Sequence, residues 1–510
     1  MFAKVLSCSL KGIESELTVV EADLSNAIPS FNVVGLPDVE VRESKERVRS
    51  AIVNSGFRFP SKRITINLCP ADTRKEGTHF DLPMAVGVLS ALEHIEKKDF
   101  NEYAIIGELS LDGKINGING ALPLILGLRS QGIDKVILPY ANAEEASIID
   151  GIELYPFCYL GEVVNFFNRS FLIEPYKGKE KKIKGKSKVT ENFSEVAGQD
   201  SVKRALQIAA AGAHNILMIG PPGAGKTMLA RRIPGILPEM TYEEKLEVTK
   251  IYSVAGQLSE KKALVTQRPF RSPHHSVSST AMVGGGRIPK PGEVSLAHFG
   301  VLFLDELPEF SRNVLEMLRQ PMEDEEVTVS RVNATYTFPS TFMLVASMNP
   351  CQCGYYGDSL HECTCTPSQV SKYMSKVSGP LLDRIDMHVE VFPVKYKELV
   401  QSNKNKSSEA MRKEVQAARS IQIERYKNYK IHYNSQLNPS LMKHYCSLGK
   451  ESKALLEAAF EKMSLSARAY NRIIKLARTI ADLDAGTNIE PMHVAEAVQY
   501  RNLDKKYRGI

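Results

Sequence analysis

The chain has 510 residues, of which 43% are hydrophobic, and it carries a formal net charge of +6. This length exceeds that of one ordinary domain, so we expect two or three globular domains, and the mildly basic balance is compatible with nucleic acid without requiring it. No stretch approaches the ~18–20 apolar residues that span a bilayer, and the N-terminus lacks the pattern of a signal peptide. We therefore expect a soluble, cytoplasmic protein without a membrane partner.

The first region, residues 1–172, mixes short β-rich stretches with helical patterns. Apolar and branched residues predict strands in LTVVEADL (17–24), RITINLCP (63–70), YAIIGELSL (103–111) and KVILPY (135–140). Helical spacing predicts helices near 38–56 and 83–95. The sequence therefore predicts an α+β domain.

Residues 173–191 differ sharply in composition. Seven lysines fall between Tyr176 and Val189, and apolar residues are almost absent. A solvated linker is the favoured interpretation, and an arm that contacts DNA is the alternative.

From residue 192 onward, helices alternate with the apolar strands NILMIG (215–220), GVLFLDEL (300–307) and TFMLVASMN (341–349). This pattern predicts a parallel, doubly wound α/β sheet at 192–395. A charged helical stretch near 409–428 and a helical tail predict a helical lid within 396–510.

A phosphate-binding loop is predicted at the end of the first of these strands. Its residues fit GxxxxGK[ST] and are Gly220, Pro221, Pro222, Gly223, Ala224, Gly225, Lys226 and Thr227. Strand, glycine loop and helix follow one another, so backbone N–H groups can hold phosphates. We expect Lys226 to reach the β- and γ-phosphates of ATP and Thr227 to ligate Mg²⁺.

Polar residues end the next two strands. Asp305 and Glu306 follow VLFL, and parallel sheets place their sites at the carboxyl ends of strands. We expect Asp305 to hold Mg²⁺ through water and Glu306 to polarise the attacking water. Asn349 ends the following strand. An Asn at a strand end is by itself usually a turn residue, but its place on the strand after Asp305 and Glu306 favours a carboxamide that orients the water.

Two later segments supply candidate arginines. LLDRID (381–386) contains Arg384, and SARAYNR (466–472) contains Arg468 and Arg472. A guanidinium can stabilise charge on a transferring phosphoryl group, and a surface ion pair is the alternative for each.

Two inserts interrupt the predicted core. Residues 267–292 are rich in Gly and Pro and contain His274 and His275, for which a structural role is favoured over metal binding. Residues 326–338 alternate apolar and polar side chains, which predicts a β-hairpin. Arg331 near its tip is a candidate contact for a DNA backbone, with a solvent-facing arginine as the equal alternative.

Four of the eight cysteines lie within residues 351–365, namely Cys351, Cys353, Cys363 and Cys365. Their spacing is CxC, nine residues, CxC. A loop with little core of its own would be fixed by four thiolates on one structural Zn²⁺. Free thiols are the alternative, and His361 is a possible substitute ligand. Cys8, Cys69, Cys158 and Cys446 are scattered and fit small buried residues.

Five motifs resemble, in sequence and in order, those of the magnesium-chelatase-like AAA+ ATPases of the ComM/YifB family. They are GPPGAGKT, VLFLDEL, SMNPCQCG, SGPLLDRIDMHVEV and SARAYNRIIKLARTIADL. The resemblance covers nearly the whole chain. It implies that Asn349 is sensor 1, that Arg384 is an arginine finger acting on a neighbouring subunit, and that Arg468 is the sensor 2 arginine. It also implies a homo-oligomer, a ring of six, and an extra helix within 395–430.

The N-terminal region resembles the protease domain of Lon around residues 75–83 and 106–120. The positions of the peptidase Ser and Lys hold His79 and Leu122 in this chain, so the dyad is absent. Lys114 lies a few residues from the second position. The resemblance implies a Lon-like fold without peptidase activity, in which His79 and Asp81 have structural roles.

The residues of the nucleotide site favour an ATP hydrolase, and the family resemblance implies that it acts as a hexameric DNA motor. The family resemblance implies a branch-migration helicase working on recombination intermediates during natural transformation. Two alternatives remain open, a motor subunit for metal insertion as in magnesium chelatase and a protein-remodelling AAA+ machine. The Lon-like region and the cysteine cluster are departures from the chelatase motor subunit.

Overall fold

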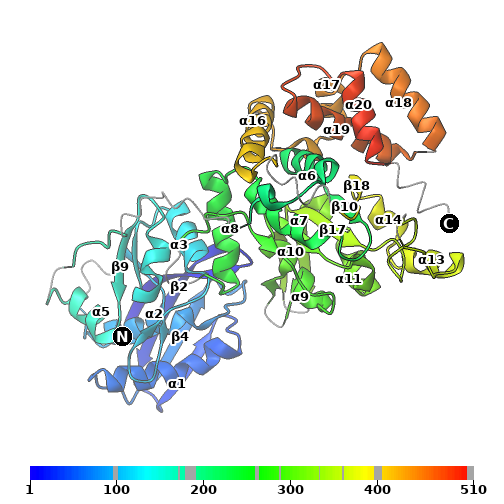
Figure 1. Cartoon of the computed structure of the whole chain (residues 1–510). Coiled ribbons are helices and arrows are strands. Elements are labelled where there is room, and N and C mark those ends of the chain that lie inside the picture. The colour runs from blue at the N-terminus through cyan, green and yellow to red at the C-terminus, as the bar shows by residue number, and fades with distance from the viewer. Residues whose placement is uncertain are drawn as a thin grey trace. The chain divides into compact units, whose positions relative to one another are not determined.

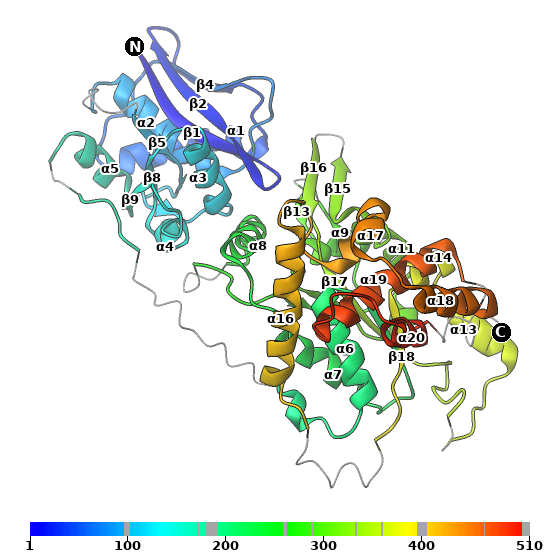
Figure 2. The same cartoon turned by 90° about the horizontal axis from the view of Figure 1, so that it is seen from above.

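The computed structural model describes residues 1–95, 102–170, 173–178, 191–258, 263–286, 289–331, 334–358, 361–394, 405–463 and 465–501. These residues divide into two compact units. Unit 1 comprises the described residues of Met1–Gly185, Lys245–Val265 and Val332–Phe338, and unit 2 those of Lys186–Glu244, Thr266–Arg331 and Pro339–Ile510. Figures 1 and 2 show their elements in two views. The predicted domain boundaries stay a prediction, since most of the linker at 173–191 and residues 395–404 lie outside the described residues.

Unit 1 is built on a seven-stranded sheet in the order β3-β4-β2-β1-β5-β8-β9. β1 is antiparallel to β2, and β2 is antiparallel to β4, whereas β5, β8 and β9 run parallel to β1. The strands are β1 (Phe2–Lys11), β2 (Glu14–Ser25), β3 (Ser30–Val34), β4 (Arg63–Cys69), β5 (Tyr103–Ile105), β8 (Lys135–Pro139) and β9 (Glu153–Phe157). A separate pair joins β6 (Glu108–Leu109) to β7 (Ile115–Asn116).

Helices cover both faces of this sheet, because successive side chains of a strand point to opposite faces. Val5 of β1 belongs to the core formed with α1 and α2, whereas its neighbour Leu6 packs against the core formed with α3 and α4. All residues of α2 are buried. The helices are α1 (Val39–Asn54), α2 (Asp81–Ala91), α3 (Ala121–Ser130), α4 (Ala143–Ala146) and α5 (Leu160–Phe167), with most of α8 (Tyr242–Val254). The predicted strands at 17–24, 63–70 and 135–140 and both predicted helices are confirmed. The stretch predicted as one strand at 103–111 is instead divided into β5 and β6, which belong to different sheets.

Unit 2 contains a five-stranded sheet in the order β11-β14-β17-β10-β18, and every pair in it is parallel. The strands are β10 (Ile216–Ile219), β11 (Phe270–Arg271), β14 (Val301–Leu304), β17 (Met343–Met348) and β18 (Met387–Glu390). Every residue of β10, β14 and β17 is buried, as expected when helices cover both faces of a parallel sheet. The predicted parallel α/β sheet is confirmed.

The helices and small sheets around this core are short. Helices α6 (Asp200–Gly212) and α7 (Lys226–Arg232) flank β10 in sequence. They are followed by α9 (Ser279–Val283), α10 (Glu293–Leu296), α11 (Arg312–Met317), α12 (Pro321–Asp324), α13 (Pro367–Met374) and α14 (Gly379–Leu382). β12 (Gly284–Gly285) pairs with β13 (Lys290–Pro291), and β15 (Glu326–Arg331) pairs with β16 (Ala334–Pro339), most of which is assigned to unit 1. The last pair, labelled in Figure 2, is the predicted hairpin.

The C-terminal part of unit 2 is helical, as predicted. It comprises α16 (Ser408–Tyr426), α17 (Pro439–Tyr445), α18 (Lys450–Met463), α19 (Ala467–Leu483) and α20 (Pro491–Gln499). α16, the extra helix expected within 395–430, packs against α6 and α19. Arg425 of α16 forms a bidentate ion pair with the buried Asp482 of α19, with N–O distances of 2.8 and 2.5 Å. This pair fixes the extra helix to the lid.

Among the described residues, no helix is both long enough and apolar enough to cross a bilayer.

Candidate functional site

The P-loop of unit 2 connects the carboxyl end of β10 to the first turn of α7. Gly225, the residue before α7, has a φ of 88°, a left-handed conformation that glycine adopts without steric cost. The turn places Lys226 and Thr227 at the N-terminus of the helix, where backbone N–H groups attract anions. The predicted strand, loop and helix context is therefore present.

Lys226 is held at the centre of the site. Its Nζ donates hydrogen bonds to the carbonyl oxygens of Gly220 and Pro221 at 2.7 and 2.9 Å, and to Oδ1 of Asn349 at 3.0 Å. Burial lowers the pKa of Lys226, while the charges of Asp305 and Glu306 act in the opposite direction. The contact with Asn349 joins the ends of β10 and β17, which are neighbours in the sheet.

Asp305 accepts hydrogen bonds from two hydroxyl groups on neighbouring elements. Thr227 Oγ1 donates to Asp305 Oδ2 at 2.7 Å, and Ser347 Oγ donates to Asp305 Oδ1. Hydroxyl and carboxylate oxygens are the donor set that Mg²⁺ prefers, and it commonly keeps several waters as further ligands. Thr227 and Asp305 therefore fit the magnesium site expected from the sequence.

Glu306 differs from Asp305 in both conformation and exposure. Its φ is 54°, a left-handed conformation that costs a non-glycine residue ~1–2 kcal/mol. Its side chain is 61% exposed, and His275 Nδ1 lies 3.8 Å from its Oε2. Backbone strain of this kind is common where a side chain must be aimed for function. An exposed carboxylate beside the magnesium ligands can accept a proton from water.

Arg384 lies at the other end of the sheet. It precedes β18, whereas the P-loop follows the parallel neighbour β10, so roughly 13 Å of strand separates them. Its side chain is buried, pairs with Glu323 at 2.7 Å and donates to the carbonyl oxygen of Pro380 at 2.8 Å. Arg384 therefore cannot reach a nucleotide on its own P-loop in this arrangement.

Two predicted arginines remain, and among the described side chains Arg468 forms no hydrogen bond or ion pair with the P-loop. Arg468 is exposed in the first turn of α19. Arg331 is the last residue of β15, and residues 332–333 of the hairpin turn lie outside the described residues. The roles predicted for both arginines stay predictions.

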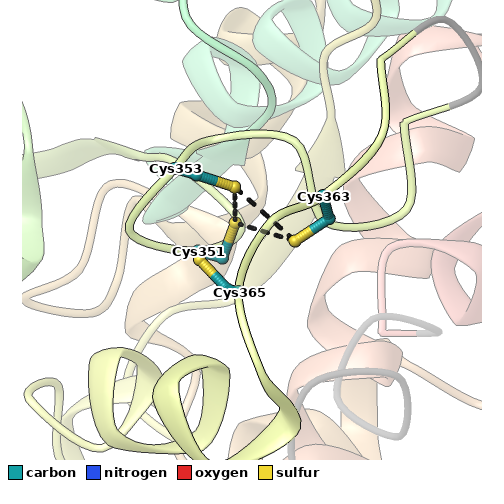
Figure 3. Close-up of side chains that lie close together, drawn as sticks. All are labelled: Cys351, Cys353, Cys363 and Cys365. Atoms are coloured by element: carbon teal, nitrogen blue, oxygen red, sulfur yellow. Dashed lines mark hydrogen bonds between the residues drawn. The ribbon is translucent and has the colours of Figure 1, made fainter.

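The four clustered cysteines meet, as Figure 3 shows. The Sγ–Sγ distances among Cys351, Cys353 and Cys363 are 3.3, 3.8 and 3.5 Å, and all four Sγ atoms lie within 4.8 Å of one another. Zn–S bonds of ~2.3 Å in a tetrahedron require Sγ–Sγ distances of about 3.8 Å, so a closed Cys₄ zinc site fits this cluster. His361 lies outside it and is 3.6 Å from Asp358.

Thiolates are the metal-binding form of cysteine. Burial acts to raise the pKa of the Cys353 thiol, but hydrogen bonds from the backbone at Tyr355 and from Cys351 outweigh it and lower this pKa to about 5. Burial and the hydrogen bond with Cys353 raise the pKa of Cys351 to about 12. The backbone at Tyr355 and, after it, the neighbouring Cys351 thus favour the thiolate form of Cys353.

The cysteine loop contacts the nucleotide site directly. Cys351 follows Asn349 by two residues, and Tyr373 of α13, beyond the loop, forms a hydrogen bond with the backbone of Asn349. Gly354 has a φ of 91°, and a Cβ atom built there would lie 2.6 Å from Cδ of Pro222 in the P-loop. The loop is therefore packed against both Asn349 and the P-loop.

In unit 1, the residues at the Lon-like positions make structural contacts. His79 is buried, its Nε2 lies 2.9 Å from the carbonyl oxygen of Cys8, and burial lowers its pKa to about 4. Asp81 forms a bidentate pair with Arg47 at 2.6 and 3.0 Å. Leu122 is fully buried, whereas Lys114 is exposed between β6 and β7. The structure gives these four residues no shared catalytic arrangement.

Three contributors to the site were not foreseen as such from the sequence. Ser347 binds Asp305, Gly354 contacts Pro222, and His275 approaches Glu306. Only Ser347 carried a local signal, because it lies two residues before Asn349 on the same strand. All three contacts join segments that are distant in sequence, so only the packing of the chain brings them together.

Comparison with known proteins gives consistent matches along the chain. The family described as "Magnesium chelatase, subunit ChlI" matches residues 192–399, "Magnesium chelatase, subunit ChlI C-terminal" matches 405–501, and "Subunit ChlI of Mg-chelatase" matches 20–142. Competence protein ComM of Haemophilus influenzae is 44% identical over 504 residues, covering 98% of this chain and 97% of that protein. YifB of Escherichia coli is 42% identical over 496 residues, covering 97% and 96%. Lon protease 2 of Bacillus subtilis is 30% identical over 157 residues, or 28% of this chain and 27% of that protein.

The exposed position of Glu306 yields a first prediction. Glu306→Gln should retain ATP affinity within about threefold but slow turnover about a hundredfold or more, because loss of a general base typically costs that much. ATP hydrolysis and binding of a fluorescent ATP analogue would be measured in parallel. Glu309→Gln, which alters a nearby exposed carboxylate, is the matched control. Turnover by the Glu306 variant at the wild-type rate would remove Glu306 from this role.

The contact between the cysteine loop and the P-loop yields a second prediction. Gly354→Ala should weaken ATP binding about tenfold, because the new methyl group must displace Pro222 in addition to the ~1–2 kcal/mol cost of a left-handed alanine. Gly357→Ala places the same strain in the same loop, at a φ of 75°, and is the control. Nucleotide titration and thermal unfolding would be compared for both variants. Equal loss of ATP affinity in the two would show that the Pro222 contact is not responsible.

Proposed function

Since this chain belongs to the magnesium-chelatase-like family of ComM and YifB, we propose that it is an ATP-driven DNA motor that promotes branch migration of recombination intermediates in natural transformation. The observation that carries the proposal is the joined nucleotide site of Lys226, Thr227, Asp305 and Asn349 in a chain aligned over 98% of its length with a competence protein. The family membership and the competence relative support the ATPase and competence roles, and the DNA activity is our inference.

The residues of the site divide the work of ATP hydrolysis. Lys226 neutralises the β- and γ-phosphates, and Thr227 and Asp305 hold Mg²⁺, which when bound offsets further phosphate charge. Glu306 accepts a proton from the attacking water, and Asn349, already bonded to Lys226, orients that water.

The position of Arg384 supports a ring of several subunits. The roughly 13 Å of strand between Arg384 and its own P-loop requires that Arg384 serve the nucleotide of a neighbouring copy, if it acts as a finger. Arg468, exposed at the start of α19, is available to the same interface. A closed ring of identical subunits gives each one such a neighbour, and the family resemblance favours six.

The β15–β16 hairpin is the candidate DNA contact. Arg331 at the end of β15 and the net charge of +6 favour contact with a phosphate backbone. A change in the nucleotide site would move the hairpin through β17, since β16 ends four residues before that strand begins. ATP turnover is thereby linked to movement along DNA.

Two further features complete the proposal. The Cys₄ cluster holds structural zinc and so fixes the loop that contacts the P-loop. Unit 1 is a Lon-like domain without peptidase activity, supported by the partial similarity to Lon protease 2 and by buried His79 and Leu122 at the dyad positions.

A second candidate function is a motor for metal insertion, because the matching family is named for a magnesium chelatase subunit. A protein-remodelling machine would share the same ATP chemistry. Both differ from the main proposal in that DNA would not stimulate ATP hydrolysis.

The proposed zinc site predicts about one zinc per chain in purified protein, because four cysteines close one tetrahedral site. Elemental analysis should find this metal, and Cys353→Ser should lose most of it and lower the melting temperature. Cys158→Ser, outside the cluster, should keep the zinc content. A fully folded, metal-free wild-type protein would refute the site.

The proposed motor predicts ATP-dependent conversion of a mobile three- or four-way DNA junction. Wild-type protein should move the junction, and Lys226→Ala should not, because it loses the cation that binds the phosphates. Gel separation of junction and product strands provides the measurement. ATP hydrolysis that no DNA stimulates, together with an unmoved junction, would overturn the DNA function and favour the metal-insertion or protein-remodelling alternative.

A further inference from the structure

Helix α1 of unit 1 carries three basic side chains along one side, which we call the α1 flank. Arg42, Lys45 and Arg49 are spaced i, i+3 and i+7, so they follow one another along the same side of the helix. The opposite side of α1 faces α2, where Arg47 pairs with Asp81. The α1 flank therefore points away from α2, at the margin of unit 1 in Figure 1.

The α1 flank has no carboxylate partner. Arg42, Lys45 and Arg49 are exposed, and within the described residues no carboxylate forms an ion pair with any of them. Glu46 borders the flank and does not pair with them either. Three exposed cations beside a single carboxylate attract a polyanion.

Aromatic rings adjoin the α1 flank. The guanidinium of Arg49 lies over the Phe59 ring, 5.6 Å from its centroid, and the centroid of the Phe31 ring on β3 is 6.1 Å from that of Phe59. Both rings are half-buried, so packing against the core holds them while part of each stays accessible. Arg58, which precedes Phe59, is exposed and adds a fourth cation. Unpaired bases stack on such rings, and the phosphates between the bases bind such cations.

We propose that the α1 flank, with Arg58, Phe31 and Phe59, forms a binding surface for single-stranded DNA. The flank spans roughly 10 Å at ~1.5 Å per residue, which matches about three phosphates of a strand spaced ~3.4 Å apart. A duplex would meet the cations alone, because its bases are already stacked and paired. The inference rests on the proposed function in taking DNA as the partner, and it gives unit 1 the role of holding an unpaired strand.

A membrane surface is the competing anionic partner. A helix that lies on a membrane buries its apolar side in the lipid boundary. The apolar residues Val41, Val48 and Ile52 of α1 are fully buried in the core of unit 1 instead. The surface thus offers cations and two partly accessible rings, which suits a strand with unpaired bases.

The test is fluorescence anisotropy of a labelled oligo-dT of about 20 nucleotides with the full-length protein, without ATP, over a range of salt concentrations. The variant Arg42→Gln/Lys45→Gln/Arg49→Gln should bind oligo-dT about tenfold more weakly at low salt. The slope of log affinity against log salt should also fall by about 2, because each phosphate contact of a single strand contributes ~0.7.

Two further variants separate the surface from net charge and from duplex binding. Lys11→Gln/Lys114→Gln/Arg129→Gln removes the same charge from exposed, scattered positions of unit 1 and should leave the salt dependence unchanged. Phe59→Leu keeps an apolar side chain but removes the ring. It should weaken oligo-dT binding severalfold and leave duplex binding unchanged, because only unpaired bases can stack there.

Wild-type affinity and salt dependence in the flank variant would overturn the proposal, and so would an equal loss in the scattered-charge variant. Equal weakening of oligo-dT and duplex binding by the flank variant, with no effect of Phe59→Leu, would overturn the assignment to single strands. Phosphatidylserine vesicles that bind through the flank when oligo-dT does not would assign it to a membrane surface. The three flank side chains are exposed, so this variant should melt at the wild-type temperature and keeps the test decisive if Phe59→Leu is unstable.

The DNA-junction experiment fails or succeeds separately. A junction that does not move, together with oligo-dT binding that depends on the α1 flank, would overturn the motor and leave this surface in place. A junction that moves, with oligo-dT binding that ignores the flank, would overturn this surface alone.

Discussion

The position of β17 between β10 and β14 is the constraint on which the rest of the site depends. Parallel strands end at the same edge, so this order brings the P-loop, the acidic pair and Asn349 together. These segments are in contact through hydrogen bonds from Lys226 to Asn349 and from Thr227 to Asp305, at 3.0 and 2.7 Å. A change in strand order would separate these groups even though every motif remained in the sequence.

The cysteine loop extends this constraint beyond the sheet. It leaves the end of β17 next to Asn349 and returns to it through Tyr373, while Gly354 touches the P-loop. A loop of this kind has few apolar residues that could hold it in one conformation. The cluster of thiols holds it in place instead. The conformation of the nucleotide site and the conformation of the cysteine loop therefore depend on each other.

The two ends of the unit 2 sheet carry different kinds of positive charge. At the carboxyl end, Lys226 is a single ammonium beside helix N–H groups, suited to a triphosphate. At the amino end, Arg384, Arg419 and Arg472 surround a cavity and are partly neutralised by acids. One sheet thus separates two cationic environments by the length of its strands.

The sequence by itself determined the elements whose signals are local. Four features could be predicted from the sequence, because each depends on neighbouring residues in the chain. They are the P-loop, the strand ending in Asp305 and Glu306, the hairpin and the cysteine spacing. β1 was not foreseen, since buried Ser7 and Ser9 interrupt its apolar pattern. Tertiary structure alone decided that Arg384 is buried in a cavity with Arg419 and Arg472, and that Gly354 meets Pro222. Those contacts join segments tens to hundreds of residues apart, and only the packing of the sheet, the lid and the cysteine loop brings them within reach.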